Sequence, residues 1–215
     1  MYLVDNQIIF LHFPKTSGTS IRMGTQNILI PPLIRHIGIN HLPSIYYKYP
    51  IFGMIRNPFS FYVSFYNYFR NNKLLNSPTK DILFCKYFIE DKTINLDDFV
   101  QVKKDFNKHL KLLLTNGHEH QIQINNYNCG LISRLYQFIY IKNNTDITPD
   151  ITIIKMEEYH LLNQLLSKYN IHINNSTKNI NSSKQIDYKL YYNEDTIKLV
   201  QKYDHDILHK YNYHF

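Results

Sequence analysis

The apolar residues of the chain fall into short runs separated by longer amphipathic stretches. Two runs, 7–13 (QIIFLHF) and 51–55 (IFGMI), are nearly continuous in apolar side chains. Such runs are typical of strands that are buried on both faces of a parallel sheet. A third run, 151–156 (ITIIKM), predicts another strand. The chain therefore carries at least three candidate strands for one buried sheet.

Helical spacing of apolar residues follows the predicted strands. It predicts helices beginning at Thr19 and covering about 58–69, 159–169 and 194–211. Residues 70–115 show mainly helical periodicity, including 96–100 and 106–114. Strands that alternate with helices indicate an α/β fold, here a P-loop-like three-layer domain with a central parallel sheet flanked by helices. The 215 residues contain no internal repeat and no dividing linker, so we expect one domain over 1–215.

The loop after the first predicted strand, 14–20 (PKTSGTS), combines the groups that bind an oxyanion. Lys15 supplies a mobile positive charge, and Gly18 permits a turn that exposes backbone N–H groups. Hydroxyls come from Thr16, Ser17, Thr19 and Ser20. The order of residues is not that of a Walker A loop, because the lysine precedes the glycine. The loop predicts a phosphate cradle at a helix N-terminus, with an ordinary strand–helix turn as the alternative.

A second candidate anion site follows the second predicted strand. Arg56 stands at the end of that strand, and Ser64 lies eight residues further on, in the next predicted helix. An arginine can grip a phosphate with two parallel hydrogen bonds, although pairing with a carboxylate is an equally ordinary use. Two anion sites on neighbouring strands indicate a ligand with two separated phosphate groups.

Three segments resemble the sulfotransferases that use 3′-phosphoadenosine-5′-phosphosulfate (PAPS). HFPKTSGTS resembles their 5′-phosphosulfate loop, FGMIRNPFSFYVSFY their 3′-phosphate motif, and YYNEDTIKLVQKYDHDILHKYNY their closing helix. The resemblance is greatest to the carbohydrate (Golgi-type) enzymes and the related bacterial or viral branch. It covers the beginning, the first third and the end of the chain, whereas 70–150 matches little. Ser60 departs from the pattern, because the family often has arginine there.

The resemblance implies a role for each matching residue. Lys15 would contact the leaving 5′-phosphate and the bridging oxygen of PAPS. The rest of the loop would donate hydrogen bonds to the phosphosulfate: Thr16, Ser17, Gly18, Thr19 and Ser20. Arg56 and Ser64 would hold the 3′-phosphate, and the segment around Ser183 and Lys184 would close over the cofactor. The expected reaction is sulfuryl transfer to a hydroxyl acceptor, most simply a carbohydrate, which leaves PAP (3′-phosphoadenosine-5′-phosphate).

The acceptor hydroxyl must lose its proton during such a transfer, so a general base is expected. The family uses histidine or glutamate. His41 lies just upstream of the second strand, at a place where related sequences carry a histidine, and it is our first candidate. His36 and an acidic residue are the alternatives. The scheme requires no metal, and the neighbouring pair His118 and His120 has no evident third ligand.

The formal net charge of +7 fits an anionic ligand, but the basic residues do not cluster into a nucleic-acid-binding motif. No apolar run approaches the roughly 20 residues that cross a bilayer, and no signal peptide is evident, so we expect a soluble, cytoplasmic protein. Two other functions stay open. A catalytically silent PAPS-binding protein could keep the phosphate sites, and a P-loop small-molecule kinase would share the strand–loop–helix plan.

Three further segments receive structural interpretations. The rings of the helix over 58–69 are expected mainly in the core, with the lining of a site for a flat ligand as the alternative. The segment 128–134 is expected, from its place in the chain, to line the acceptor site. The run 203–206 (YDHD) is interpreted as a polar face of the last helix.

Overall fold

The computed structural model describes six stretches of the chain: residues 1–30, 38–71, 98–116, 129–141, 149–173 and 186–215. The chain divides into two compact units, each built from two separate segments. The first comprises Met1–Asn57 and Leu135–Ser182, and the second comprises Pro58–Arg134 and Ser183–Phe215. The expectation of one domain over the whole chain stays a prediction.

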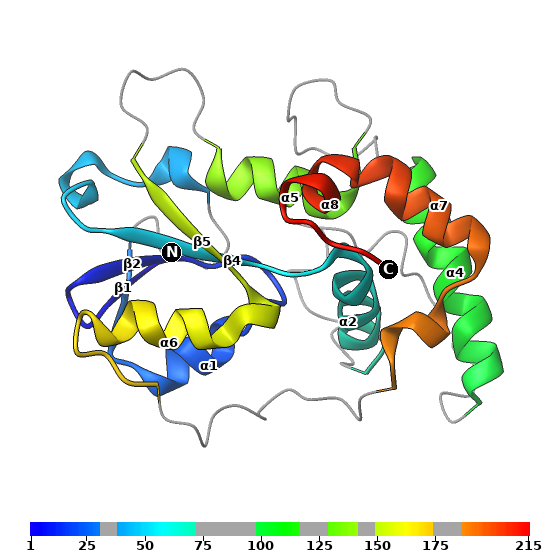
Figure 1. Ribbon diagram of the computed structural model, residues 1–215, viewed down its shortest axis with the longest axis horizontal. Helices are drawn as coiled ribbons and strands as arrows, with labels where there is room; N and C mark the ends of the chain where they lie inside the picture. The colour runs from blue at the N-terminus through cyan, green and yellow to red at the C-terminus, as the bar shows by residue number, and fades with distance from the viewer. Residues whose placement is uncertain (31–37, 72–97, 117–128, 142–148, 174–185) are drawn as a thin grey trace. The chain divides into compact units, whose positions relative to one another are not determined.

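A five-stranded mixed sheet forms the centre of the first unit, in the order β3-β1-β2-β4-β5 (Figure 1). The strands are β1 (Tyr2–Val4), β2 (Ile8–Leu11), β3 (Asn27–Leu29), β4 (Ile51–Ile55) and β5 (Ile151–Lys155). The three predicted strands β2, β4 and β5 are parallel neighbours, which confirms the parallel centre of the sheet. Because β1 pairs antiparallel with both β2 and β3, the whole sheet is mixed rather than parallel.

The antiparallel edge begins with a tight hairpin that the sequence pattern did not predict. Asp5 and Asn6, between β1 and β2, both have positive φ angles, of 46° and 56°. The Gln7 N–H donates to the Val4 carbonyl across this turn, at 3.0 Å. Asp and Asn tolerate the left-handed conformation better than most residues, so the Asp5–Asn6 pair is the sequence signal for this hairpin.

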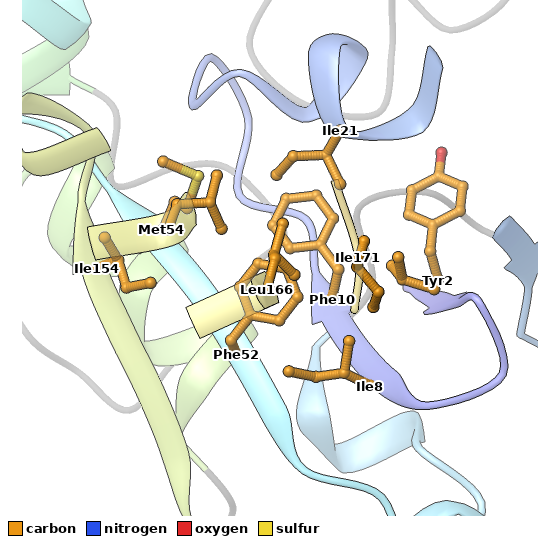
Figure 2. Close-up of a cluster of buried hydrophobic side chains, with 11 residues drawn as sticks. Tyr2, Ile8, Phe10, Ile21, Phe52, Met54, Ile154, Leu166 and Ile171 are labelled. Atoms are coloured by element: carbon orange, nitrogen blue, oxygen red, sulfur yellow. The ribbon is translucent and has the colours of Figure 1, made fainter. Parts of the chain in front are cut away.

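Alternate strand residues pack onto the two faces of the sheet. On one face, Phe10, Phe52 and Met54 join a buried cluster with side chains of the two helices that cover it, α1 (Gly18–Gly24) and α6 (Tyr159–Ser167) (Figure 2). Figure 1 shows both helices below the sheet.

The opposite face receives the end of helix α5 (Leu131–Tyr140). The Tyr140 ring covers Gly53 so closely that a Cβ on this glycine would lie 2.3 Å from the ring, and the Tyr140 hydroxyl donates to the Met54 carbonyl at 2.7 Å. Helices therefore cover both faces, which agrees with the α/β prediction.

The second unit is helical. Its elements are α2 (Pro58–Asn71), α4 (Phe99–Asn116), the first turn of α5, α7 (Glu194–Tyr203), α8 (His205–Lys210) and the 3₁₀ turn η8 (Tyr188–Tyr191). Its core is aromatic: the rings of Phe59, Phe106 and Tyr192 meet edge to face, with centroids 5.0–5.5 Å apart. The expectation that the rings of α2 are mainly core is confirmed for Phe59, Phe61, Tyr62, Phe65 and Tyr66, each at most 5% exposed.

Most predicted helices are present within one turn of their expected bounds, with two corrections. The predicted helix over 194–211 is interrupted at Asp204, where φ is −111° and ψ is 23°, and so becomes α7 and α8. Helix α5 was not predicted, although its buried residues Leu131, Leu135 and Ile139 recur at four-residue spacing. The described residues hold seven α-helices, and none of those helices is long and apolar enough to cross a membrane.

Candidate functional site

The loop between β2 and α1 has an unusual backbone. Lys15 and Ser17 both have positive φ angles, of 62° and 59°, a conformation that is uncommon for residues other than glycine. Each such residue costs of the order of 1–2 kcal/mol. Ser17 is left-handed and Gly18 is the first residue of the right-handed helix α1. Alternation of left- and right-handed residues is the backbone arrangement of a nest, a turn whose successive N–H groups can bind an anion.

Thr16 lies between these two residues and is completely buried. Its hydroxyl donates to the Phe13 carbonyl at 2.8 Å, so this proton serves the loop itself. The role expected for Thr16 toward a phosphosulfate stays a prediction.

Gly18 is required for space rather than for a positive φ. None of the described glycines has a positive φ, whereas a Cβ on Gly18 would lie 1.8 Å from His12 Nε2. The His12 ring stacks on Phe10, with centroids 5.4 Å apart, and this arrangement holds the ring against the start of α1. The sequence analysis did not single out His12, the residue that packs against Gly18.

Arg56 follows β4 directly, and its guanidinium reaches the loop between β2 and α1. Arg56 Nη1 donates to the Lys15 carbonyl at 3.4 Å, so the structure brings the two predicted cations together. Burial, and then the charge of Arg56, lower the pKa of Lys15 from 10.5 to about 8. Two positive charges held at one edge of the sheet form a natural place for an anion, which would relieve their repulsion.

The topology explains why these residues meet. β2 and β4 are parallel neighbours, with Leu11 opposite Gly53, so Lys15 and Arg56 follow the same edge of the sheet. Open α/β sheets bind their ligands at the carboxyl ends of the strands. β5 adds Glu157 at this edge, where Glu157 Oε1 accepts a hydrogen bond from the Asn57 N–H at 2.9 Å.

The sequence analysis missed Glu157, although its position in the sequence could have pointed to it. The acidic pair Glu157–Glu158 follows the third predicted strand directly, just as Arg56 follows the second. Residues at corresponding positions after parallel strands meet at one edge. The neighbouring Glu158 makes a different contact, an ion pair with Lys155 at 3.2 Å.

The other predicted phosphate ligands have separate placements. Thr19 and Ser20 are half-buried in the first turn of α1, where hydroxyls can face a ligand at the loop. Ser64 is half-buried in the second turn of α2 and belongs to the second unit. Ser183 and Lys184 lie outside the described residues.

His41, the first candidate for the general base, lies in a 3₁₀ turn, η1 (Ile39–His41). Its side chain is exposed, and its ring centroid is 6.3 Å from that of Phe138. The connection that carries His41 leads to the amino end of β4, whereas Lys15 and Arg56 follow carboxyl ends. The catalytic role of His41 stays a prediction, and His36 lies outside the described residues.

The second unit holds a buried carboxylate, Asp204, which is fully inaccessible to solvent. Asp204 Oδ1 accepts hydrogen bonds from the Ser133 N–H at 3.0 Å and the Ser133 hydroxyl at 2.8 Å. Asp204 Oδ2 accepts one from the Tyr62 hydroxyl. Gly130 leaves room for this cluster, since a Cβ there would lie 2.3 Å from the carboxylate.

The cluster corrects one interpretation of the sequence and involves a second segment that was singled out there. Asp204 was assigned to a polar helix face, but only its neighbours His205 and Asp206 are exposed. Two residues of segment 128–134, Gly130 and Ser133, lie against Asp204, and the expectation that this segment lines the acceptor site stays a prediction. Burial raises the pKa of Asp204 to about 6, an effect that the hydrogen bonds from Tyr62 and Ser133 oppose.

A second buried polar cluster lies on α4. The Tyr66 hydroxyl donates to Asp105 Oδ2 at 2.6 Å, and His109 Nδ1 lies 3.0 Å from Asp105 Oδ1. All three side chains are at most 5% exposed. These side chains satisfy one another's hydrogen-bonding capacity, as is usual for polar groups in a protein core.

Metal ligands do not gather in the described parts of the chain, which contain no group of three or more His, Cys, Asp or Glu side chains able to hold an ion. His118 and His120 lie outside those parts. Comparison of the sequence with protein-family models, with curated proteins and with solved structures finds no significant match.

Proposed function

We propose that the protein is a PAPS-dependent sulfotransferase with a P-loop-like nucleotide-binding unit. The observation that carries the proposal is the pairing of Lys15 with Arg56 at the carboxyl edge of β2 and β4, on a loop with two left-handed residues. The motifs that contain these residues resemble the 5′-phosphosulfate and 3′-phosphate motifs of that family. The geometry supports the binding half of the function most directly.

In the proposed complex, the loop N–H groups and Lys15 bind the 5′-phosphosulfate and Arg56 binds the 3′-phosphate, for which Ser64 stays a predicted further ligand. The acceptor oxygen attacks sulfur in line as the bond between sulfur and the bridging oxygen breaks. PAP leaves with the electron pair of that bond, and the acceptor proton passes to the base, for which His41 remains the first candidate. Lys15 stabilises the charge that develops on the leaving oxygen.

The lowered pKa of Lys15 suits this role. At pH 7 a lysine with a pKa of about 8 is still mainly protonated, yet it gives up its proton more readily than an ordinary lysine. Lys15 can therefore act as a cation toward the phosphosulfate and as a proton donor to the bridging oxygen. A carbohydrate hydroxyl is the proposed acceptor, because the motifs resemble those of the carbohydrate branch of the family.

Calorimetric titration with PAP and with ADP tests the cofactor. These ligands carry the same number of phosphates, but only PAP has one at the 3′ position. We expect tighter binding of PAP, and we expect Arg56→Ala to lower PAP affinity roughly 100-fold while ADP affinity changes little, because a charge-assisted fork is lost. Arg22→Ala, on the exposed surface of α1, is the matched control. Equal affinity of the unmodified protein for PAP and ADP would contradict the assignment.

A catalytically silent PAPS-binding protein is the second candidate, because His41 is exposed on the connection to the amino end of β4. Transfer of labelled sulfate from PAPS to a panel of glycans separates the two. Turnover that is abolished in His41→Ala, with PAP affinity unchanged, supports the enzyme. PAP binding without turnover on any acceptor in the panel supports the silent protein.

A further inference from the structure

The connection between β4 and α2 consists of Arg56 and Asn57, and it is held from both sides. On the side of β2, Arg56 Nη1 donates to the Lys15 carbonyl at 3.4 Å. On the side of β5, the Asn57 N–H donates to Glu157 Oε1 at 2.9 Å, although the two residues are 100 positions apart in the chain. Pro58 follows at once and has no N–H of its own.

Glu157 is placed to make this contact by the strand that precedes it. β5 ends at Lys155, which lies opposite Ile55 in the parallel register with β4. Glu157 then sits in a 3₁₀ turn, η6 (Met156–Glu158), directly beside the end of β4. The contact is therefore a product of sheet register, not of local sequence.

We infer that Glu157 is a positioning residue for the arginine that receives the 3′-phosphate. Its carboxylate fixes the peptide that follows Arg56, and so fixes the direction in which the guanidinium leaves the sheet. The inference rests on the proposed function, because it gives Arg56 a phosphate to bind. A charged acceptor on a backbone N–H is stronger than a neutral one, which suits a role in orientation.

The strand order argues against a direct chemical role for Glu157. β4 lies between β2 and β5 in the sheet. Lys15, which would contact the leaving group, follows β2, whereas Glu157 follows β5 and lies beyond Arg56. A carboxylate on that side is suited to support the 3′-phosphate site rather than to take a proton at the sulfuryl group.

The test compares PAP and ADP affinities in Glu157→Ala, Glu157→Gln and Glu158→Ala. Glu157→Ala removes the acceptor, and we expect PAP affinity to fall roughly tenfold while ADP affinity changes less than about twofold. Glu157→Gln keeps a carbonyl acceptor at the same reach and is expected to restore PAP affinity to within about threefold. Glu158→Ala breaks the Lys155 ion pair instead, and is expected to match the unmodified protein.

The ratio of PAP to ADP affinity separates positioning from a merely structural role. Glu157 is exposed, so its truncation opens no core cavity, and all three variants are expected to melt within a few degrees of the unmodified protein. Equal losses for PAP and ADP in Glu157→Ala, unchanged PAP affinity, or no rescue by Glu157→Gln would each overturn the inference. Failure of the proposed function is seen separately, in the unmodified protein, as a lack of preference for PAP.

Discussion

Two polar regions of the molecule differ in how their charges are compensated. At the edge of the sheet, Lys15 and Arg56 place like charges together, on a backbone with left-handed residues. In the helical unit, Asp204 is fully buried, and hydrogen bonds from Tyr62 and Ser133 satisfy both of its oxygens. The first arrangement costs stability and the second maintains structure.

This contrast is the one expected between a functional site and a structural one. A buried polar group that is fully hydrogen-bonded needs nothing further, and its removal harms the fold. Strain and like-charge repulsion persist in a folded protein only when the surrounding structure enforces them, and they are concentrated at sites of function. We therefore expect substitutions in the two regions to act in opposite directions on stability.

The largest effect is expected from Asp204→Ala. The change leaves the Tyr62 hydroxyl and both donors of Ser133 buried without an acceptor, so we expect the free energy of unfolding to fall by about 3–5 kcal/mol. Urea denaturation measures this loss. Asp206→Ala, two residues away on the exposed surface, is the control and should change stability by less than about 0.5 kcal/mol. A small loss in Asp204→Ala would mean that the cluster is not structural.

The two regions should also respond in separate ranges of pH. Burial raises the folded-state pKa of Asp204 from 3.8 to about 6, so the folded protein binds this proton more tightly than the unfolded chain. The contribution of Asp204 to stability is therefore present below about pH 4 and is lost as the pH rises to 6, a change of about 3 kcal/mol. Asp204→Asn should lack this fall in denaturation curves measured across the range.

The contribution of Lys15 to stability should change with pH in the opposite direction. Its folded-state pKa is lowered from 10.5 to about 8, so the unfolded chain binds the proton more tightly. Stability due to Lys15 should rise between pH 8 and about 10.5. Lys15→Met should remove this rise and leave the fall at acid pH unchanged. A rise that persists in Lys15→Met would assign it to another group.

The smallest effect is expected from Lys15→Asn, which should stabilise the free protein. Asparagine tolerates a positive φ better than lysine and removes the repulsion with Arg56, so we expect a gain of about 0.5–1 kcal/mol in the free energy of unfolding. The same variant should lose PAP binding in the calorimeter. Lys48→Asn, on the exposed surface, is the control. A loss of stability in Lys15→Asn would show that the loop is not strained at this position.

Elements with a strong apolar pattern were predicted well from the sequence. The strand Ile51–Ile55 and the start of α2 at Pro58 are confirmed as predicted, because a continuous apolar run followed by Asn-Pro leaves few alternatives. β1 and β3 are only three residues long, too short to show a period. Asp204 was misassigned because its run of polar neighbours hides a residue whose partners are 71 and 142 positions away.

The sequence by itself determined the parallel strands, most of the helices and the two motifs that end in Lys15 and Arg56. These are local properties, because a run of apolar residues or a hydroxyl-rich loop can be recognised without knowing which distant residues it contacts. Only the tertiary structure decided that Arg56 reaches the Lys15 carbonyl, that Glu157 holds Asn57, and that Asp204 is buried. Those contacts depend on strand order, register and helix packing, which join residues that are far apart in the chain.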